Sequence, residues 1–195
     1  MTSRREAILR ASATAIAERG VRGLRVGDVA QVAGVSPGLL YYYFKDRDGL
    51  LAAALTYIND QARAYRKAAD DSGPPREQLI SQLLAELQDT PEIIENSLAW
   101  NELRASAVYE QPLREPLART SRQWTNEIAD AIRVAQAVGD VSDAVDAQQV
   151  GLVVTALTEG LAARWLSREL TADDARAHLR STLETLLPTS ESAPG

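Results

Sequence analysis

The stretch of sequence that decides the fold is residues 26–51, VGDVAQVAGVSPGLLYYYFKDRDGLL. Gly34 separates two short apolar segments and can take the left-handed conformation that a tight turn requires. Ser36 followed by Pro37 is typical of a helix N-terminus, where Ser caps and Pro occupies the first position. The stretch therefore predicts a helix over 26–33, a turn, and a second short helix that ends near Phe44. This is the layout of a helix-turn-helix.

Apolar residues recur at helical spacing on both sides of this stretch. A first helix is expected between the capping box Ser3-Arg4-Arg5-Glu6 and the stop at Gly20, and Asp46 is expected to cap a longer helix that runs toward Ala69. Further helices are predicted over 75–88, 91–109, 112–137, 145–168 and 172–187, the last with a capping box at Thr171–Asp174. Residues 188–195 are expected to be a flexible tail. No strand pattern interrupts the series, so the predicted fold class is all-α.

The composition excludes several kinds of chemistry. The chain of 195 residues has no cysteine and one histidine. Disulfide scaffolds, thiolate metal sites and cysteine nucleophiles are therefore excluded, and His178 is assigned no role. The sequence offers no recognisable set of catalytic residues, so an enzyme is not expected, and neither a metal nor a cofactor is predicted. No apolar run is long enough to span a bilayer and no signal peptide is recognised, so we expect a cytoplasmic protein without membrane contact.

The charge is distributed unevenly along the chain. The net charge is −6, but residues 1–50 contain eight Lys or Arg and five Asp or Glu, which gives +3, and the remainder carries −9. A basic end on an acidic body indicates a nucleic-acid-binding segment. A solvated face without a binding role remains the alternative at this point.

Four of the ten aromatic residues stand together at positions 41–44. Leu40 and Phe44 are four residues apart and share one helix face, which we assign to the core. Gly38 and Tyr42 then face outward, with Leu39 and Tyr41 on the flanks. Leu39 could contact a thymine methyl, and the helix N-terminus at Ser36 and Pro37 could approach a phosphate. The alternative is that the aromatic run belongs entirely to the core.

Residues 26–51 resemble the DNA-binding signature of TetR-family transcriptional regulators, and the similarity extends over about residues 4–55. The run Ser-Pro-Gly-Leu-Leu-Tyr-Tyr is most similar to the betaine-repressor-like branch. The resemblance implies a ligand-responsive one-component regulator, in which a homodimer represses by binding operator DNA and is released by a small-molecule effector. It also implies a helix-turn-helix DNA-binding domain at 1–50 and a helical ligand-binding and dimerisation domain at 51–187. An activator of the same fold and a helical interaction module without DNA binding are the alternatives.

The resemblance implies roles for individual residues. Pro37, Gly38, Leu39 and Tyr42 are the candidates for base contacts, and Tyr41, Tyr43, Lys45 and Arg47 are candidates for phosphate contacts. Arg47 stands where the family usually has Lys. Arg25 replaces the usual Thr or Ser cap of the second helix and is a further candidate for a phosphate contact. Gly27 replaces a side chain that often reads a base, which puts base reading by that helix in doubt.

The resemblance also implies that the last two helices form the dimer interface. Over 145–168 the apolar residues form a sustained stripe, and small residues beside it would permit close helix approach. The stripe consists of Val150, Val153, Val154, Leu157, Leu161 and Trp165, and the last helix carries Leu179, Leu183, Leu186 and Leu187. Two such helices from each of two chains would form a four-helix interface. The alternative is that both stripes pack within one chain.

The middle helices offer few polar or aromatic residues for a ligand pocket. Such sites combine apolar walls with a small number of polar groups. The candidates for effector binding are Trp100, Arg104, Tyr109, Trp124 and Glu159, with Asn101 and Glu102 as further polar residues. A buried Glu would favour a cationic ligand and a buried Arg an anionic one, and the sequence leaves this choice open.

Overall fold

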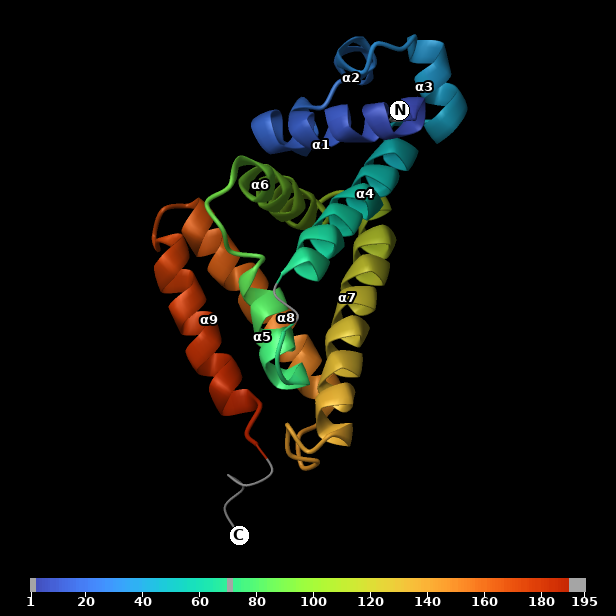
Figure 1. Cartoon of the computed structure of the whole chain (residues 1–195). Coiled ribbons are helices and arrows are strands. Elements are labelled where there is room, and N and C mark those ends of the chain that lie inside the picture. The colour runs from blue at the N-terminus through green and yellow to red at the C-terminus, as the bar shows by residue number, and fades with distance from the viewer. Residues whose placement is uncertain (1–2, 70–71, 190–195) are drawn as a thin grey trace. The chain divides into compact units, whose positions relative to one another are not determined.

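The computed structural model describes residues 3–69 and 72–189, and every regular element within these ranges is an α-helix (Figure 1). The all-α prediction is confirmed. The helices are α1 (Arg4–Gly23), α2 (Val26–Val32), α3 (Pro37–Phe44), α4 (Arg47–Ala68), α5 (Pro75–Leu84), α6 (Pro91–Ser106), α7 (Gln111–Ala137), α8 (Ala147–Leu166) and α9 (Ala172–Leu186). None of them has a stretch both long and apolar enough to cross a membrane. Of the predicted tail at 188–195, residues 190–195 lie outside the described residues.

Two helices end three or four residues earlier than predicted. α5 stops at Leu84 and not at residue 88, and α6 stops at Ser106 and not at residue 109. At both ends the backbone tightens, because N–H groups donate to the carbonyl three residues back, as from Leu87 to Leu84 and from Tyr109 to Ser106. Such closing turns satisfy the last carbonyls of a helix without extending it.

The described residues form two compact units. Of these residues, 3–62 and 91–120 belong to unit 1, and 63–69, 72–90 and 121–189 belong to unit 2. In unit 1, α6 packs along α1, and α1 also contacts α2 and α3. The core of unit 1 includes Ile8, Ile16, Leu40, Leu50, Leu55 and Leu103, all fully buried. In unit 2, α9 packs against α8 and α5. Leu179, Leu183 and Leu187 are fully buried there, so these leucines follow the alternative of packing within the chain.

Side-chain caps fix several helix starts as predicted. Ser3 accepts a hydrogen bond from the Glu6 N–H, which is its half of the predicted capping box. The capping box of α9 is complete, since Thr171 and Asp174 each accept from the other's backbone. The hydrogen bonds from the Thr171 side chain and backbone lower the pKa of Asp174. Caps of this kind supply acceptors for N–H groups that have no partner within the helix.

Gly20 interrupts α1 where the stop was predicted. Its φ of 72° and ψ of 169° lie in a region that is essentially restricted to glycine. A Cβ atom on Gly20 would lie 2.9 Å from Oε1 of Glu102, which belongs to α6. The position therefore demands glycine for its backbone conformation, and a Cβ atom would in addition displace the Glu102 carboxylate.

We predict that Gly20→Ala lowers the free energy of unfolding by about 2–4 kcal/mol, because it adds backbone strain and a contact with Glu102. Chemical denaturation at fixed protein concentration measures this. Gly27→Ala is the matched control, since a Cβ atom there meets nothing within 4 Å. The control should be neutral or slightly stabilising. Equal effects of the two substitutions would contradict the role assigned to Gly20.

Candidate nucleic-acid interface and ligand-binding residues

α3 divides into a core face and an outward face as the spacing predicted. Leu40 and Phe44 are buried, whereas Tyr42 is 80% exposed. Gly38 and Tyr41 are also exposed, and Leu39 is half-buried. The Tyr42 ring meets the Tyr43 ring edge to face, with ring centres 5.6 Å apart. An exposed tyrosine braced by a neighbouring ring presents a flat surface and a hydroxyl to a partner.

The N-terminus of α3 is capped and open to a partner. The Ser36 hydroxyl accepts a hydrogen bond of 3.2 Å from the Leu39 N–H, and Pro37 occupies the first helical position. Both residues are exposed. At the start of α2, Arg25 is exposed and makes no side-chain cap bond. The missing Thr or Ser thus leaves α2 without that cap, and the Arg25 side chain stays accessible.

The turn from α3 into α4 is strained. Lys45 has a φ of 66° and a ψ of −55°, and the Asp46 N–H donates back to the Phe44 carbonyl over 2.8 Å. The Asp46 carboxylate accepts from the Gly49 N–H at 2.7 Å, which confirms the predicted cap of α4. A Cβ atom on Gly49 would lie 2.1 Å from the Phe44 carbonyl oxygen. The tight turn leaves the Lys45 side chain exposed beside α3.

Arg47 makes contacts within the chain that the sequence did not reveal. Its Nη2 donates to the Val21 carbonyl over 2.6 Å, and its Nη1 forms an ion pair with Glu110 over 3.2 Å. The fork of a guanidinium serves two acceptors at once, which Lys at this position could not do in the same geometry. The phosphate contact of Arg47 stays a prediction.

Glu102 binds the backbone N–H of the same residue, Val21. Its Oε1 accepts from the Val21 N–H at 3.0 Å and from the Ser106 hydroxyl at 3.2 Å. Seven residues earlier on α6, Glu95 accepts from the Thr14 hydroxyl at 2.8 Å. The sequence analysis named Glu102 as a further polar residue for the pocket. In the structure its carboxylate instead accepts a hydrogen bond from the backbone of α1.

The five candidates for ligand binding are distributed over both units. On α6 in unit 1, the Arg104 guanidinium lies over the Trp100 ring, 5.9 Å from its centre. Asn101 on the same helix is half-buried. Tyr109 follows α6 and is 78% exposed. In unit 2, Trp124 is buried and Glu159 is half-buried.

Trp124 has neighbours in unit 2 that the sequence analysis missed. The Arg66 guanidinium lies 5.4 Å from the centre of the Trp124 ring and forms ion pairs with Glu86 and Glu127. Glu127 also pairs with Arg63, and Glu86 accepts from the Tyr65 hydroxyl. No motif joins positions that lie this far apart in the chain, so spacing alone could not find the group.

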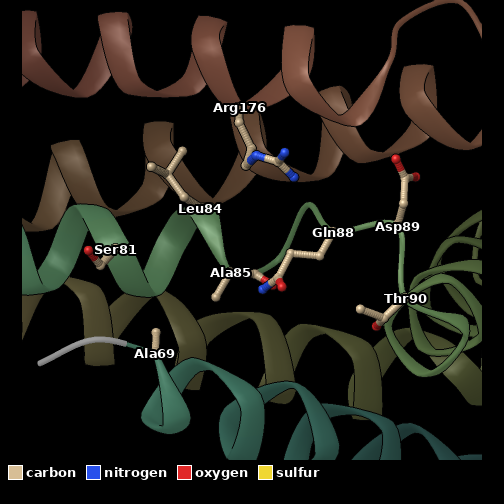
Figure 2. A pocket seen from close by; sticks show the side chains of 8 residues that line it. All are labelled: Ala69, Ser81, Leu84, Ala85, Gln88, Asp89, Thr90 and Arg176. Atoms are coloured by element: carbon tan, nitrogen blue, oxygen red, sulfur yellow. The ribbon is translucent and has the colours of Figure 1, made fainter.

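Unit 2 also contains an open pocket with a volume of about 540 Å³. Figure 2 shows Arg176 of α9 facing the end of α5 and the segment that follows it. The lining residues are Ala69, Ser81, Leu84, Ala85, Gln88, Asp89, Thr90 and Arg176. None of the five ligand candidates lines this pocket, and it has no aromatic wall.

Two family models match the chain. Residues 8–54 match the bacterial regulatory proteins of the tetR family, and residues 75–188 match the C-terminal domain of BetI-type transcriptional repressors. The first match covers the helix-turn-helix with α1 and the start of α4. The second covers α5 to α9.

Individual relatives agree with these matches. The transcriptional regulator BetI of Burkholderia thailandensis is 31% identical over 69% of this chain and 72% of its own length. A crystal structure from Rhodococcus sp., assigned to the TetR family, has a TM-score of 0.93 and 61% identity over 96% of this chain and all of that one. A regulator from Saccharomonospora viridis in complex with choline has a TM-score of 0.76 and 26% identity, over 94% and 96% of the two chains. The chain therefore belongs to the TetR family of transcriptional regulators, with a C-terminal domain of the BetI repressor type.

Proposed function

We propose that this regulator is a repressor that binds operator DNA as a homodimer and leaves it when a small-molecule effector binds. It would act in the cytoplasm, where the DNA is, and without a catalytic step. The observation that carries the proposal is the outward face of α3, on which Tyr42 is exposed beside the capped helix N-terminus. Two such helices in a dimer would enter successive major grooves about 34–36 Å apart.

The residues around α3 divide into two roles on DNA. Pro37, Gly38, Leu39 and Tyr42 are proposed to face base edges, because they lie at the N-terminus and on the outward face of the helix. Tyr41, Tyr43, Lys45, Arg47, Arg25 and Ser36 are proposed to face the phosphates. Phosphate contacts supply affinity that falls with salt, whereas base contacts supply sequence preference.

An apolar face on α8 supports the proposed dimer. Leu152 is 61% exposed and Val153 is 44% exposed, and Ala156 and Gly160 are exposed on the same helix. A Cβ atom on Gly160 would meet nothing within 4 Å. Leu179 and Leu183 of α9 are buried within the chain, and so are Val154, Leu161 and Trp165 of the predicted α8 stripe. The exposed side of α8 would therefore supply the apolar contacts of the interface, and α9 would add polar ones.

Effector binding is proposed to favour a conformation in which the two α3 helices have a different spacing. The free energy available for this change is the difference in effector affinity between the two conformations, typically about 1–3 kcal/mol. The choline complex of the Saccharomonospora viridis relative supports a small-molecule effector for this chain. Trp100, Arg104, Tyr109, Trp124 and Glu159 remain the proposed contacts.

We predict that Tyr42→Ala weakens binding to the operator by about 10- to 100-fold while binding to unrelated duplex DNA changes little, because a base contact is lost. Titration of labelled duplexes at fixed salt measures both affinities. Tyr109→Ala is the matched control, because it removes an equally exposed tyrosine outside α3. A specific affinity that survives Tyr42→Ala would refute the assignment of α3.

We predict that Leu152→Glu converts the dimer into a monomer, because it places a charge in the apolar contact. Light scattering after size-exclusion chromatography gives the mass directly. Val32→Glu is the control, since Val32 is an aliphatic residue of α2 that is 71% exposed. A Leu152→Glu protein that stays dimeric, or a wild-type chain that is monomeric, would contradict the proposed interface.

A further inference from the structure

Arg66 and Trp124 form the centre of a buried polar cluster in unit 2. Arg66 projects from α4 and is 6% exposed, and Trp124 projects from α7 and is 5% exposed. The guanidinium lies over one face of the indole. Nη1 of Arg66 donates to the Glu86 carboxylate, whose side chain is 11% exposed. One half of the guanidinium is thus firmly held.

The other half of the guanidinium has an ion pair with Glu127 but no hydrogen bond, and the indole N–H has no hydrogen bond either. Within the described residues, Nη2 of Arg66 and Nε1 of Trp124 are buried and have no hydrogen-bond partner. Nη2 lies 3.7 Å from Oε2 of Glu127, which is beyond hydrogen-bond distance. A buried donor without an acceptor costs about 1–3 kcal/mol, and more for a charged group. The two unsatisfied donors therefore lower the stability of the protein, and a ligand oxygen that accepts from them would remove this free-energy cost.

We propose that these two donors receive a carboxylate of the effector, one oxygen at Nη2 of Arg66 and one at Nε1 of Trp124. This inference rests on the proposed function, since it names the chemical class of the molecule that releases the operator. A carboxylate fits because it supplies two acceptor oxygens, and its bond to a guanidinium is charge-assisted and so stronger than a bond to a neutral oxygen.

Glu127 can move away from Nη2 of Arg66 and still keep other hydrogen-bond partners. Its side chain is 35% exposed, and it accepts from Arg63 and from the Gln123 amide. When the effector's carboxylate takes Nη2, Glu127 keeps these two partners, and Arg66 keeps Glu86. Each carboxylate in the cluster then has a donor, and the buried donors are satisfied.

The same geometry disfavours a purely cationic ligand at this place. A quaternary ammonium group would be recognised by an open aromatic face, but here the Arg66 guanidinium already covers one face of Trp124. A quaternary ammonium group also has no acceptor atom, so it would leave Nη2 of Arg66 and Nε1 of Trp124 without a hydrogen bond. A carboxylate is thus the group that the cluster selects.

The test follows the three indole N–H resonances of the full-length protein by nitrogen-15 NMR. The Trp124 resonance is assigned by its loss in Trp124→Phe. Trp165 is an internal control, because its Nε1 already donates to Asp89 over 2.9 Å. Four probes of matched shape are titrated at equal ionic strength: choline, glycine betaine, 3,3-dimethylbutanol and 3,3-dimethylbutanoate. They vary the carboxylate and the ammonium group independently.

We expect both carboxylate probes to move the Trp124 resonance downfield and to leave Trp165 unchanged, and both alcohols to have no effect. Trp124→Phe should weaken carboxylate binding by about tenfold, since one hydrogen bond to a charged group is lost. An unmoved Trp124 resonance with all four probes overturns the inference, because a water molecule would then be the natural partner of these donors. An equal response to choline and glycine betaine overturns it as well.

Failure of this inference can be told apart from failure of the proposed function. Operator binding and its dependence on Tyr42 are measured without any effector. If the protein binds the operator and Tyr42→Ala weakens that binding, but the Trp124 resonance does not shift, only the proposed class of effector is wrong. If the chain binds no operator, the proposed function falls, and the NMR titration still reports whether the cluster takes a carboxylate.

Discussion

The DNA-reading end depends on the backbone of Val21, because charged side chains bind both its N–H and its carbonyl group. Glu102 of α6 accepts from its N–H, and Arg47 at the start of α4 donates to its carbonyl. Val21 is fully buried, so neither group could turn to water instead. Gly20 leaves room for this contact, since a Cβ atom there would displace the Glu102 carboxylate. The start of α4 is thus linked to α1 and to α6 through the backbone of a single residue, Val21.

Three glutamates along the α6 region attach it to the reading end. Glu95 holds Thr14, Glu102 holds Val21, and Glu110 pairs with Arg47. Their spacing of seven and eight residues corresponds to about two helical turns, which places Glu95 and Glu102 on one face. A shift of α6 would therefore act on α1 and on the start of α4 together, as the proposed change in spacing between the reading helices requires.

Local signals predicted most of the fold, and the reasons are visible residue by residue. Ser36, Asp46 and Thr171 cap helices in the structure because caps need only a side chain and an N–H a few residues on. The burial of Leu40 and Phe44 was also predictable from a local signal, because residues four apart lie on one face of a helix. The contacts of Arg47 with Glu110 and of Arg66 with Trp124 join residues about sixty positions apart, and no local spacing reveals them. The candidate DNA-reading face was therefore foreseeable, whereas the group around Trp124 was not.

We expect the placement of the DNA-binding helices, more than their charge, to determine the affinity for the operator. The substitution Glu102→Ala distinguishes these two effects. Removing an acidic group would strengthen DNA binding if charge alone decided the affinity, because less repulsion opposes the phosphates. The loss of the Val21 clamp predicts the opposite sign. The decisive measurement is the operator affinity of the folded Glu102→Ala protein against wild type: we expect binding at least several-fold weaker, and an unchanged or tighter affinity would contradict the role of the clamp.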